Sequence, residues 1–326
     1  MALYLTEDDV ARLLTMQDCI AAVEEGFRDW AEGTASNRPR ARAALRGGLL
    51  HVLPAASDRL GRMAAKVYAT TRGGARFVVL LFDGRSSEML AVLEADRLGQ
   101  IRTGAASGVA TRHLARQEAT ILGILGSGWQ ARSQALAIST VRRLDTIRAW
   151  GRDPGRLRAF CREVEAACGV PAIAVRSPEM AVRGAGIVVT ATSAAQPVLD
   201  AAWIDPGTHI NAVGSNRADR RELEERAVLR ADLIVVDSLE QARLEAGDLL
   251  AVSGTASEGG LFDRVVELAA VVTGRHPGRG AATDVTLFKS LGLGLEDLVS
   301  ASLVYDLALK TGAGRPFPSP AAPPQP

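Results

Sequence analysis

The sequence predicts an α/β protein that combines a doubly wound parallel sheet with a discontinuous α+β domain formed by the two ends of the chain. Between about residues 120 and 240, short apolar runs alternate with helical segments, the pattern of a parallel sheet with helices on its faces. The first ninety-odd residues show helices and alternating strands, which indicates a mostly antiparallel sheet. The expected boundaries are 1–115 with 295–326 for the discontinuous domain and 116–294 for the parallel sheet.

Composition does not point to a nucleic-acid or membrane partner. The 326 residues carry a formal net charge of +1, and 23% of them are charged, so no large basic surface is expected. The longest strongly apolar runs, such as Phe77–Phe82, are too short to span a bilayer, and the N-terminal segment lacks a signal-peptide pattern. The three cysteines follow no metal-ligand spacing. We therefore expect a soluble, cytoplasmic protein without a metal site.

The N-terminal elements follow from cap and alternation signals. Thr6 and Thr15 each precede an acidic residue by three positions, which predicts two helix starts, and the second helix should end at about Gly33. A basic extended segment comes next. The remaining expected elements are strands at Leu49–Leu53 (stopped by Pro54) and Met63–Thr70, a hairpin of Phe77–Phe82 with Met89–Glu94, and a helix rich in small residues at Asp96–Ala115.

The strongest motif in the chain reads G-x-G-x-x-A between an apolar run and a helical pattern. Ile121–Leu125 predicts a buried strand, and the helix that follows the glycines runs to about Val141. Gly126 allows the tight turn, Gly128 lets a pyrophosphate approach the backbone, and Ala131 lets the helix pack close to the strand. The N–H groups at the start of that helix would hold the phosphates. This setting predicts a Rossmann-type dinucleotide site.

Later segments continue the parallel sheet and then return to the first domain. Strands are expected at 146–150, 172–176, 187–191, 209–213, 233–236 and, with a loop, 286–294. Ser177-Pro178 predicts a short helix start. We also expect helical structure from about 240 to Gly274, a long helix at Leu295–Thr311, and a proline-rich tail from Arg315 onward that is disordered or draped over a surface.

The end of the second strand bears on the choice of cofactor. In this fold an acidic residue about twenty positions after the glycines binds the ribose 2′-hydroxyl of NAD. That position is Gly151 here, and Arg152 follows it. A glycine leaves room and an arginine supplies donors for a 2′-phosphate, which favours NADP(H), with NAD(H) possible. The alternative is that Asp153 serves as the acid and Arg152 is a solvated charge.

Candidate substrate-binding groups precede the glycine motif. Lys66 stands in an otherwise apolar strand, where it either faces solvent or binds a carboxylate. Arg102, among small residues, has the same two interpretations. Arg40 and Arg42 belong to a basic run in which surface charge is the commoner interpretation, and His51 is either a ligand contact or an ordinary strand histidine.

Several of these segments together resemble the ornithine cyclodeaminase/mu-crystallin family. The resemblance covers nearly the whole chain, from about Leu5 to Gly312. The segments that carry it are Lys66-Val-Tyr, Ile101-Arg-Thr-Gly-Ala-Ala-Ser107, Gly126-Ser-Gly-Trp-Gln-Ala131, Ala212-Val-Gly-Ser-Asn216, Arg221-Glu-Leu223, Asp237-Ser238 and Glu245-Ala-Gly-Asp248.

The resemblance implies a homodimer whose discontinuous domain binds substrate and forms the dimer. It implies that Arg40, Lys66 and Arg102 hold the α-carboxylate of an α-imino or α-amino acid, with His51 near the substrate. Lys66, Arg102 and Asn216 are then the expected catalytic residues. The residues expected to bind the cofactor are Thr103, Gly126, Ser127, Gly128, Gln130, Ala131, Gly151, Arg152, Thr190, Ala191, Thr192, Val213, Gly214, Ser290 and Leu291.

Two departures from the family pattern bear on the chemistry. Cyclodeaminases carry a carboxylate in the loop where this chain has Asn216, and an amide hydrogen-bonds but does not accept a proton. His51 stands where they carry a glutamate. Both departures favour reduction of an imine over cyclodeamination.

Expected substrates are Δ1-pyrroline-2-carboxylate, Δ1-piperideine-2-carboxylate, iminosuccinate, or pyruvate with ammonia. If the second carboxylate of iminosuccinate is bound, His51 or Arg42 could hold it. The alternatives are ornithine cyclodeaminase and alanine dehydrogenase. An alternative of another class is a non-catalytic, mu-crystallin-like protein that binds NADPH or another ligand.

Overall fold

The computed structural model describes residues 2–253 and 260–318 and divides the chain into two compact units. Unit 1 comprises Met1–Arg102 and Leu293–Pro326, and unit 2 comprises Thr103–Gly292. The expected boundary at residue 115 lies at the end of helix α3 (Asp96–Leu114), whereas the division between the units falls inside that helix. Residues 319–326 of the proline-rich tail lie outside the described residues.

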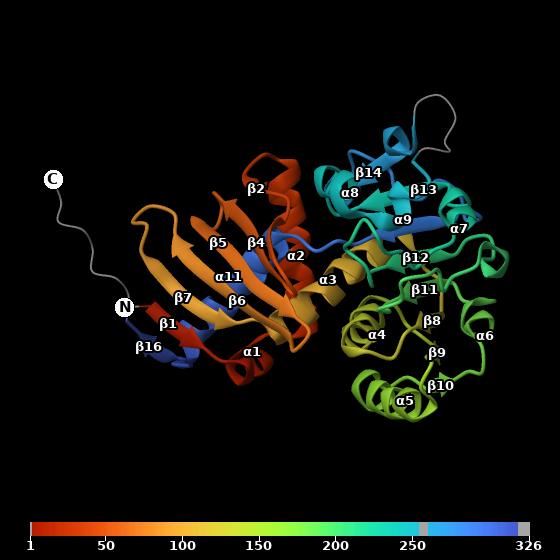
Figure 1. The fold of residues 1–326 in the computed structure, drawn as a ribbon, viewed down its shortest axis with the longest axis horizontal. Coiled ribbons are helices and arrows are strands. Elements are labelled where there is room, and N and C mark those ends of the chain that lie inside the picture. Colours follow the sequence, from red (N-terminus) through yellow and green to blue (C-terminus); the bar gives the residue numbers. More distant parts are fainter. Residues whose placement is uncertain (1, 254–259, 319–326) are drawn as a thin grey trace. The chain divides into compact units, whose positions relative to one another are not determined.

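Unit 1 is built on an eight-stranded sheet, as its hairpins predict (Figure 1). The order is β16-β1-β7-β6-β5-β4-β2, with β3 also paired to β4, and within this sheet only β1 and β7 run parallel. The strands are β1 (Ala2–Leu5), β2 (Ala35–Asn37), β3 (Ala41–Leu45), β4 (Gly48–Ser57), β5 (Arg62–Thr71), β6 (Gly74–Asp83), β7 (Met89–Glu94) and β16 (Arg315–Phe317).

Three further helices belong to unit 1, and their predicted caps are confirmed. Thr6 caps α1 (Glu7–Leu13) in a capping box with Asp9, and Thr15 caps α2 (Met16–Ala31). The C-terminal helix α11 (Gly294–Thr311) packs on β4, β5 and β6 and on α2 (Figure 1). A Cβ at Gly26 of α2 would lie 3.0 Å from Val299, so the absence of a side chain lets the two helices approach closely.

Two predictions in unit 1 are wrong. Pro54 does not end its strand, because it falls between the last residue of β4 paired with β3 (Val52) and the first paired with β2 (Ala55), where its missing N–H costs little. The start of the proline-rich tail is neither disordered nor merely draped, since Arg315–Phe317 pairs with β1 as an edge strand.

Unit 2 is an eight-stranded, wholly parallel sheet in the order β10-β9-β8-β11-β12-β15-β13-β14. The order turns back between β8 and β11, which is the place where doubly wound sheets bind ligands at the carboxyl ends of their strands. The strands are β8 (Ile121–Leu125), β9 (Thr146–Trp150), β10 (Ala172–Ala174), β11 (Ile187–Thr190), β12 (His209–Ala212), β13 (Leu233–Val236), β14 (Val265–Glu267) and β15 (Thr286–Lys289).

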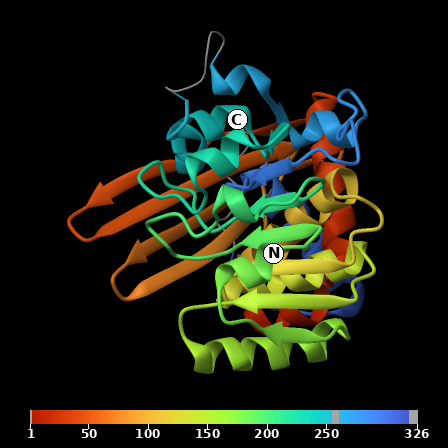
Figure 2. The same ribbon diagram turned by 90° about the vertical axis from the view of Figure 1, so that its right-hand side faces the viewer.

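Both faces of this sheet are covered, as is usual for a parallel sheet. Along β11, Val188 belongs to one buried cluster, whereas Ile187 and Val189 belong to another on the opposite face. Helices α4 (Trp129–Val141) and α5 (Pro154–Cys168) cover the second face, and α5 runs beside the β9–β10 edge (Figure 2). The first face is covered by α6 (Pro178–Val182), α7 (Glu225–Leu229), α8 (Leu239–Glu245) and α9 (Gly247–Leu250).

The prediction of continuous helical structure from 240 to Gly274 is wrong in part. The β-branched pair Val265–Val266 forms β14 beside β13, because its apolar side chains fit the pleated edge of the sheet better than a helix. Helix α10 (Leu268–Val272) follows directly. Among the described residues, no helix is both long enough and apolar enough to cross a bilayer.

Candidate active site

The glycine turn after β8 has the shape that a dinucleotide requires. Gly126 has a φ of 120°, and a Cβ there would lie 2.4 Å from the carbonyl oxygen of Ala191, so only glycine fits. Gly128 caps α4, and a Cβ at that position would meet nothing within 4 Å. Ala131 is fully buried in the first turn of the helix. Open space therefore lies against the N–H groups of a helix N-terminus, which suits a pyrophosphate.

In the turn after β9, Asp153 serves as a helix cap and Arg152 is exposed. The Asp153 carboxylate caps α5, accepting hydrogen bonds from the amides of Gly155 (2.8 Å) and Arg156 (2.9 Å). These bonds, with that of Arg156 foremost, lower the pKa of Asp153. A Cβ at Gly151 would lie 2.7 Å from Ser127 Oγ, so the glycine keeps this turn close to the glycine motif.

The loops after β11 and β12 are held together by a buried carboxylate that was not among the predicted site residues. Glu222 is fully buried and accepts four hydrogen bonds. They come from Thr190 Oγ1 (2.8 Å), Thr192 N and Oγ1 (2.7 Å each) and Gly214 N (2.7 Å). Three of the residues expected to bind the cofactor thus share one partner.

A second layer fixes Glu222 itself. Asp248 Oδ1 accepts from the amides of Glu222 (2.7 Å) and Leu223 (2.9 Å). Lys289, fully buried at the end of β15, places its Nζ 2.9 Å from Asp248 Oδ2 and donates to the carbonyl of Ser215 (2.7 Å). We call Glu222, Asp248 and Lys289 the loop cluster. Glu222 and Asp248 stand in the Arg221-Glu-Leu223 and Glu245-Ala-Gly-Asp248 segments, which was the available signal for them.

The loop after β15 depends on another buried acid. Asp237 Oδ2 accepts from the amides of Leu291 (2.5 Å) and Gly292 (2.7 Å), and Ser290 Oγ lies 3.5 Å away. Burial, opposed by these bonds, raises the pKa of Asp237 to about 6. Apart from Thr103 of α3, the predicted cofactor residues of unit 2 therefore lie at or just after the carboxyl ends of β8, β9, β11, β12 and β15.

In unit 1 the predicted cations are buried and accompanied by two acids. Lys66 is 3% exposed, so it does not face solvent, and its Nζ lies 3.0 Å from Asp297 Oδ1. Arg102 contacts the same oxygen through Nε (2.8 Å) and Glu296 Oε2 through Nη1 (2.7 Å). Arg40 is also buried, and its charge is one of those that lower the pKa of Lys66. We call these five residues the clamp cluster.

Burial and neighbouring charges shift the pKa of Lys66 and the pKa of Arg102 in opposite directions. Burial first, then the nearby charge of Arg102, lower the pKa of Lys66 to about 8, although Asp297 opposes the shift. The charges of Asp297 and Glu296 outweigh burial at Arg102 and raise its pKa. Glu296 and Asp297 were missed because their partners lie about 200 residues earlier in the chain.

The remaining predicted residues occupy less decisive positions. His51 is buried and stacks face to face on Tyr68 at 4.2 Å, with Nε2 3.1 Å from Thr70 Oγ1. Arg42 is exposed on β3. Asn216 is partly buried in the loop after β12, the carbonyl of Thr103 accepts from Gln134, and Gln130 lies partly buried in the first turn of α4.

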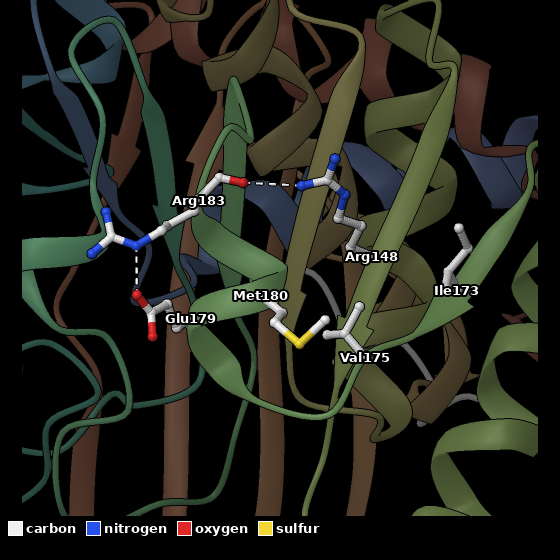
Figure 3. Close-up of a pocket in the computed structure, with 6 residues that line it drawn as sticks. All are labelled: Arg148, Ile173, Val175, Glu179, Met180 and Arg183. Carbon is white, nitrogen blue, oxygen red and sulfur yellow. Dashed lines mark hydrogen bonds and ion pairs between the residues drawn. The ribbon is translucent and has the colours of Figure 1, made fainter.

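A surface hollow of about 470 Å³ in unit 2 lies away from this chemistry (Figure 3). Its charged groups already have partners within the hollow, because Arg183 pairs with Glu179 and Arg148 donates to the carbonyl of Arg183. Six residues of β9, β10, α6 and their flanks line it: Arg148, Ile173, Val175, Glu179, Met180 and Arg183. None of them was expected in the site. The described residues also contain no group of His, Cys, Asp or Glu side chains suited to a metal ion.

Known proteins share this architecture and sequence. The Δ1-pyrroline-2-carboxylate reductase of Bacillus cereus is 39% identical over 240 residues, 73% of this chain and 72% of that protein. The Thermococcus litoralis enzyme of the same name, solved with NADH and L-proline, matches with a TM-score of 0.91 at 33% identity, covering 97% of this chain and all of that one.

An archaeal alanine dehydrogenase dimer with bound NAD matches with a TM-score of 0.90 at 31% identity, covering 96% of this chain and 98% of that one. The model of the ornithine cyclodeaminase/mu-crystallin family matches residues 2–312. The resemblance seen in the sequence is confirmed: the chain belongs to the ornithine cyclodeaminase/mu-crystallin family.

Proposed function

We propose that the protein reduces a small α-imino monocarboxylate to the L-amino acid, with NADPH as the preferred cofactor. The chain is an NAD(P)(H)-dependent oxidoreductase of the class that acts on CH–NH groups. In this proposal unit 2 binds the cofactor and unit 1 binds the substrate carboxylate. The observation that carries the substrate class is the clamp cluster, in which buried cations outnumber buried acids.

The charge of the clamp cluster suits one carboxylate. Within the clamp cluster, Arg40, Lys66 and Arg102 are three buried cations, and Glu296 and Asp297 are two buried acids. A buried net charge is costly unless a partner of opposite sign compensates it. A monocarboxylate would supply that partner.

Neither of the two residues considered for binding a second carboxylate, His51 and Arg42, is well placed for it. His51 lies flat on the Tyr68 ring, and Arg42 is exposed on β3. Iminosuccinate would therefore bring one charge more than the clamp cluster balances. Δ1-pyrroline-2-carboxylate, Δ1-piperideine-2-carboxylate and the imine of pyruvate fit better.

The side chains provide binding and proton transfer. Arg102 is held rigidly by two acids and therefore presents a fixed cation to the carboxylate. Lys66, with a pKa of about 8, exchanges a proton near neutral pH and is suited to protonating the imine nitrogen directly or through water. NADPH, when bound, supplies the hydride. Asn216 cannot serve as the base that cyclodeamination requires.

Arg152 supports the preference for NADPH, because Asp153 is occupied as a helix cap and Gly151 keeps this turn close to Ser127 of the glycine motif. The T. litoralis relative was solved with NADH, so the preference needs a direct test. Changing Arg152 to Ser should lower the NADPH-to-NADH ratio of kcat/KM about 10- to 100-fold, the range expected for a lost charge-assisted hydrogen bond. Arg158→Ser, an exposed change on α5, is the control. An unchanged ratio in Arg152→Ser would contradict the assignment.

The decisive experiment measures NADPH and NADH oxidation at 340 nm with Δ1-pyrroline-2-carboxylate, Δ1-piperideine-2-carboxylate, iminosuccinate, and pyruvate with ammonia. We expect a monocarboxylate to be turned over with a kcat/KM at least about tenfold above that of iminosuccinate, because an uncompensated buried charge is costly. Preference for iminosuccinate would refute the charge argument. Tight NADPH binding without turnover would instead favour a ligand-binding protein.

A homodimer is proposed as well, since the alanine dehydrogenase relative was solved as a dimer. Light scattering on the purified protein should give twice the 34.3 kDa chain mass. A monomeric mass would remove this part of the proposal.

A further inference from the structure

Glu222 of unit 2 binds two loops through one buried carboxylate. Its four hydrogen-bond donors come from the ends of two different strands: Thr190 and Thr192 follow β11, and Gly214 follows β12. Both loops belong to the predicted cofactor site. A single carboxylate therefore fixes the separation of two cofactor loops.

The fit between Glu222 and these loops is tight. A Cβ at Gly214 would lie 2.3 Å from Glu222 Oε1 and 2.4 Å from the carbonyl oxygen of Thr192. Any side chain at position 214 would push the loops apart, so the glycine and the glutamate depend on each other.

The contacts require the ionised carboxylate. All four partners donate, and an ionised carboxylate accepts at both oxygens, whereas a glutamine would direct its NH2 group at two of these donors. Burial raises the pKa of Glu222, and the charge of Lys289 is the largest of the opposing influences. Asp248 holds the Glu222 backbone and Lys289 at once. The loop cluster is thus arranged to keep Glu222 negative and in place.

The order of the strands places the turn that carries Arg152 and the two loops bound by Glu222 on opposite sides of the glycine turn. The strands run β9-β8-β11-β12, with the glycine turn between the Arg152 end of β9 and the Glu222-bound loops. The glycine turn packs directly against Ala191. If the pyrophosphate binds at this turn, the adenosine half lies toward β9 and the nicotinamide half toward β11 and β12.

We propose that Glu222 is a positioning residue for the nicotinamide half of the cofactor, acting through Thr192 and Gly214. The proposal rests on the dinucleotide binding assigned above but not on the identity of the imino acid. It assigns Arg152 and Glu222 to opposite halves of the same ligand.

The test compares a whole cofactor with a fragment that lacks nicotinamide. Dissociation constants of NADPH and 2′-phospho-ADP-ribose are measured by calorimetry for wild type and Glu222→Gln, with NADH and ADP-ribose as a parallel pair. Glu222→Gln should weaken NADPH at least about tenfold and the fragment less than twofold, because only the nicotinamide loops move. Glu225→Gln, an exposed neighbour paired with Arg221, is the matched control and should change neither.

A purely structural role gives a different result. If Glu222→Gln weakens both ligands equally, or neither, or if wild type binds NADPH no more tightly than the fragment, the proposal is overturned. Should Glu222→Gln fail to fold, Thr192→Val removes the hydroxyl contact with Glu222 (2.7 Å) and the one accepted from Ala194 N (3.2 Å), and it must show the same selective loss in smaller degree. Absence of imine turnover would refute the proposed function and leave these binding constants interpretable.

Discussion

The two units each bury a charged cluster, and the clusters differ in what balances their charge. In the loop cluster of unit 2, two acids accompany one lysine, yet backbone and hydroxyl donors from the chain satisfy the acids. In the clamp cluster of unit 1, three cations accompany two acids. In the loop cluster, hydrogen-bond donors of the chain surround the acids, whereas in the clamp cluster the cations outnumber the acids that pair with them.

This comparison distinguishes charged residues that stabilise the fold from charged residues that are proposed to bind the substrate. The loop cluster is complete within its own chain and should affect substrate binding little. In the proposed function, the clamp cluster binds the substrate carboxylate. Variants in the two clusters should therefore fail in different ways.

The largest effect is expected from Arg102→Ala. This change removes the proposed contact with the substrate carboxylate and takes the guanidinium away from Glu296 and Asp297, while Asp297 keeps its contact with Lys66. We expect kcat/KM for the imino acid to fall about 100-fold or more, and stability to fall by about 3–5 kcal/mol. Steady-state kinetics and urea unfolding measure the two effects. The exposed Arg42→Ala is the control, and near-normal kcat/KM in Arg102→Ala would disprove the clamp.

Lys289→Met should damage stability without touching substrate affinity. Asp248 would lose its buried cation, at a cost of about 3–5 kcal/mol in the free energy of unfolding. KM for the imino acid should stay within about twofold of wild type, because Lys289 belongs to unit 2 and to the loop cluster. A large rise in that KM with unchanged stability would invalidate the distinction between the clusters.

The smallest effect is a pH dependence with opposite signs for activity and stability. Above the Lys66 pKa of about 8 the clamp loses a cation, so kcat/KM should fall about tenfold per pH unit. Between pH 8 and the ordinary value of 10.5, the unfolded chain retains the proton that the folded chain has lost, so Lys66 destabilises the fold less as pH rises.

Lys66→Met removes the titrating group and supplies the control for this prediction. Its residual activity should lack the alkaline limb, and its unfolding free energy should lack the Lys66 contribution between pH 8 and 10.5. Retention of the limb in this variant would assign it to another group.

Sequence reasoning succeeded where a property is local. The glycine turn, the caps at Thr6 and Thr15, and the apolar strand around Lys66 are encoded within a few residues of one another. The alternation of apolar residues alone did not decide whether the Lys66 side chain points to solvent or into the protein. In the structure the Lys66 side chain is buried and pairs with the buried side chain of Asp297.

The failures all depend on distant partners. Pro54 continues its strand because two different neighbours pair on either side of it, and Val265–Val266 forms a strand because β13 offers an edge. The role of Glu222 in binding two loops could not be predicted from the sequence, because its four hydrogen-bond donors come together only when β11 and β12 pair in the folded sheet. Each of these depends on contacts that no short window contains.

Helix α11 has a consequence for the order in which the molecule is made. Unit 2 is one continuous stretch, so a ribosome delivers all of it before the residues that complete unit 1. Lys66 and Arg102 are synthesised roughly 200 residues ahead of Glu296 and Asp297. During synthesis the first sheet lacks both the helix that covers it and the acids that pair with its cations. That long loop can close only after α11 has been synthesised, so a chain stopped before α11 would contain all residues of unit 2 but an incomplete unit 1.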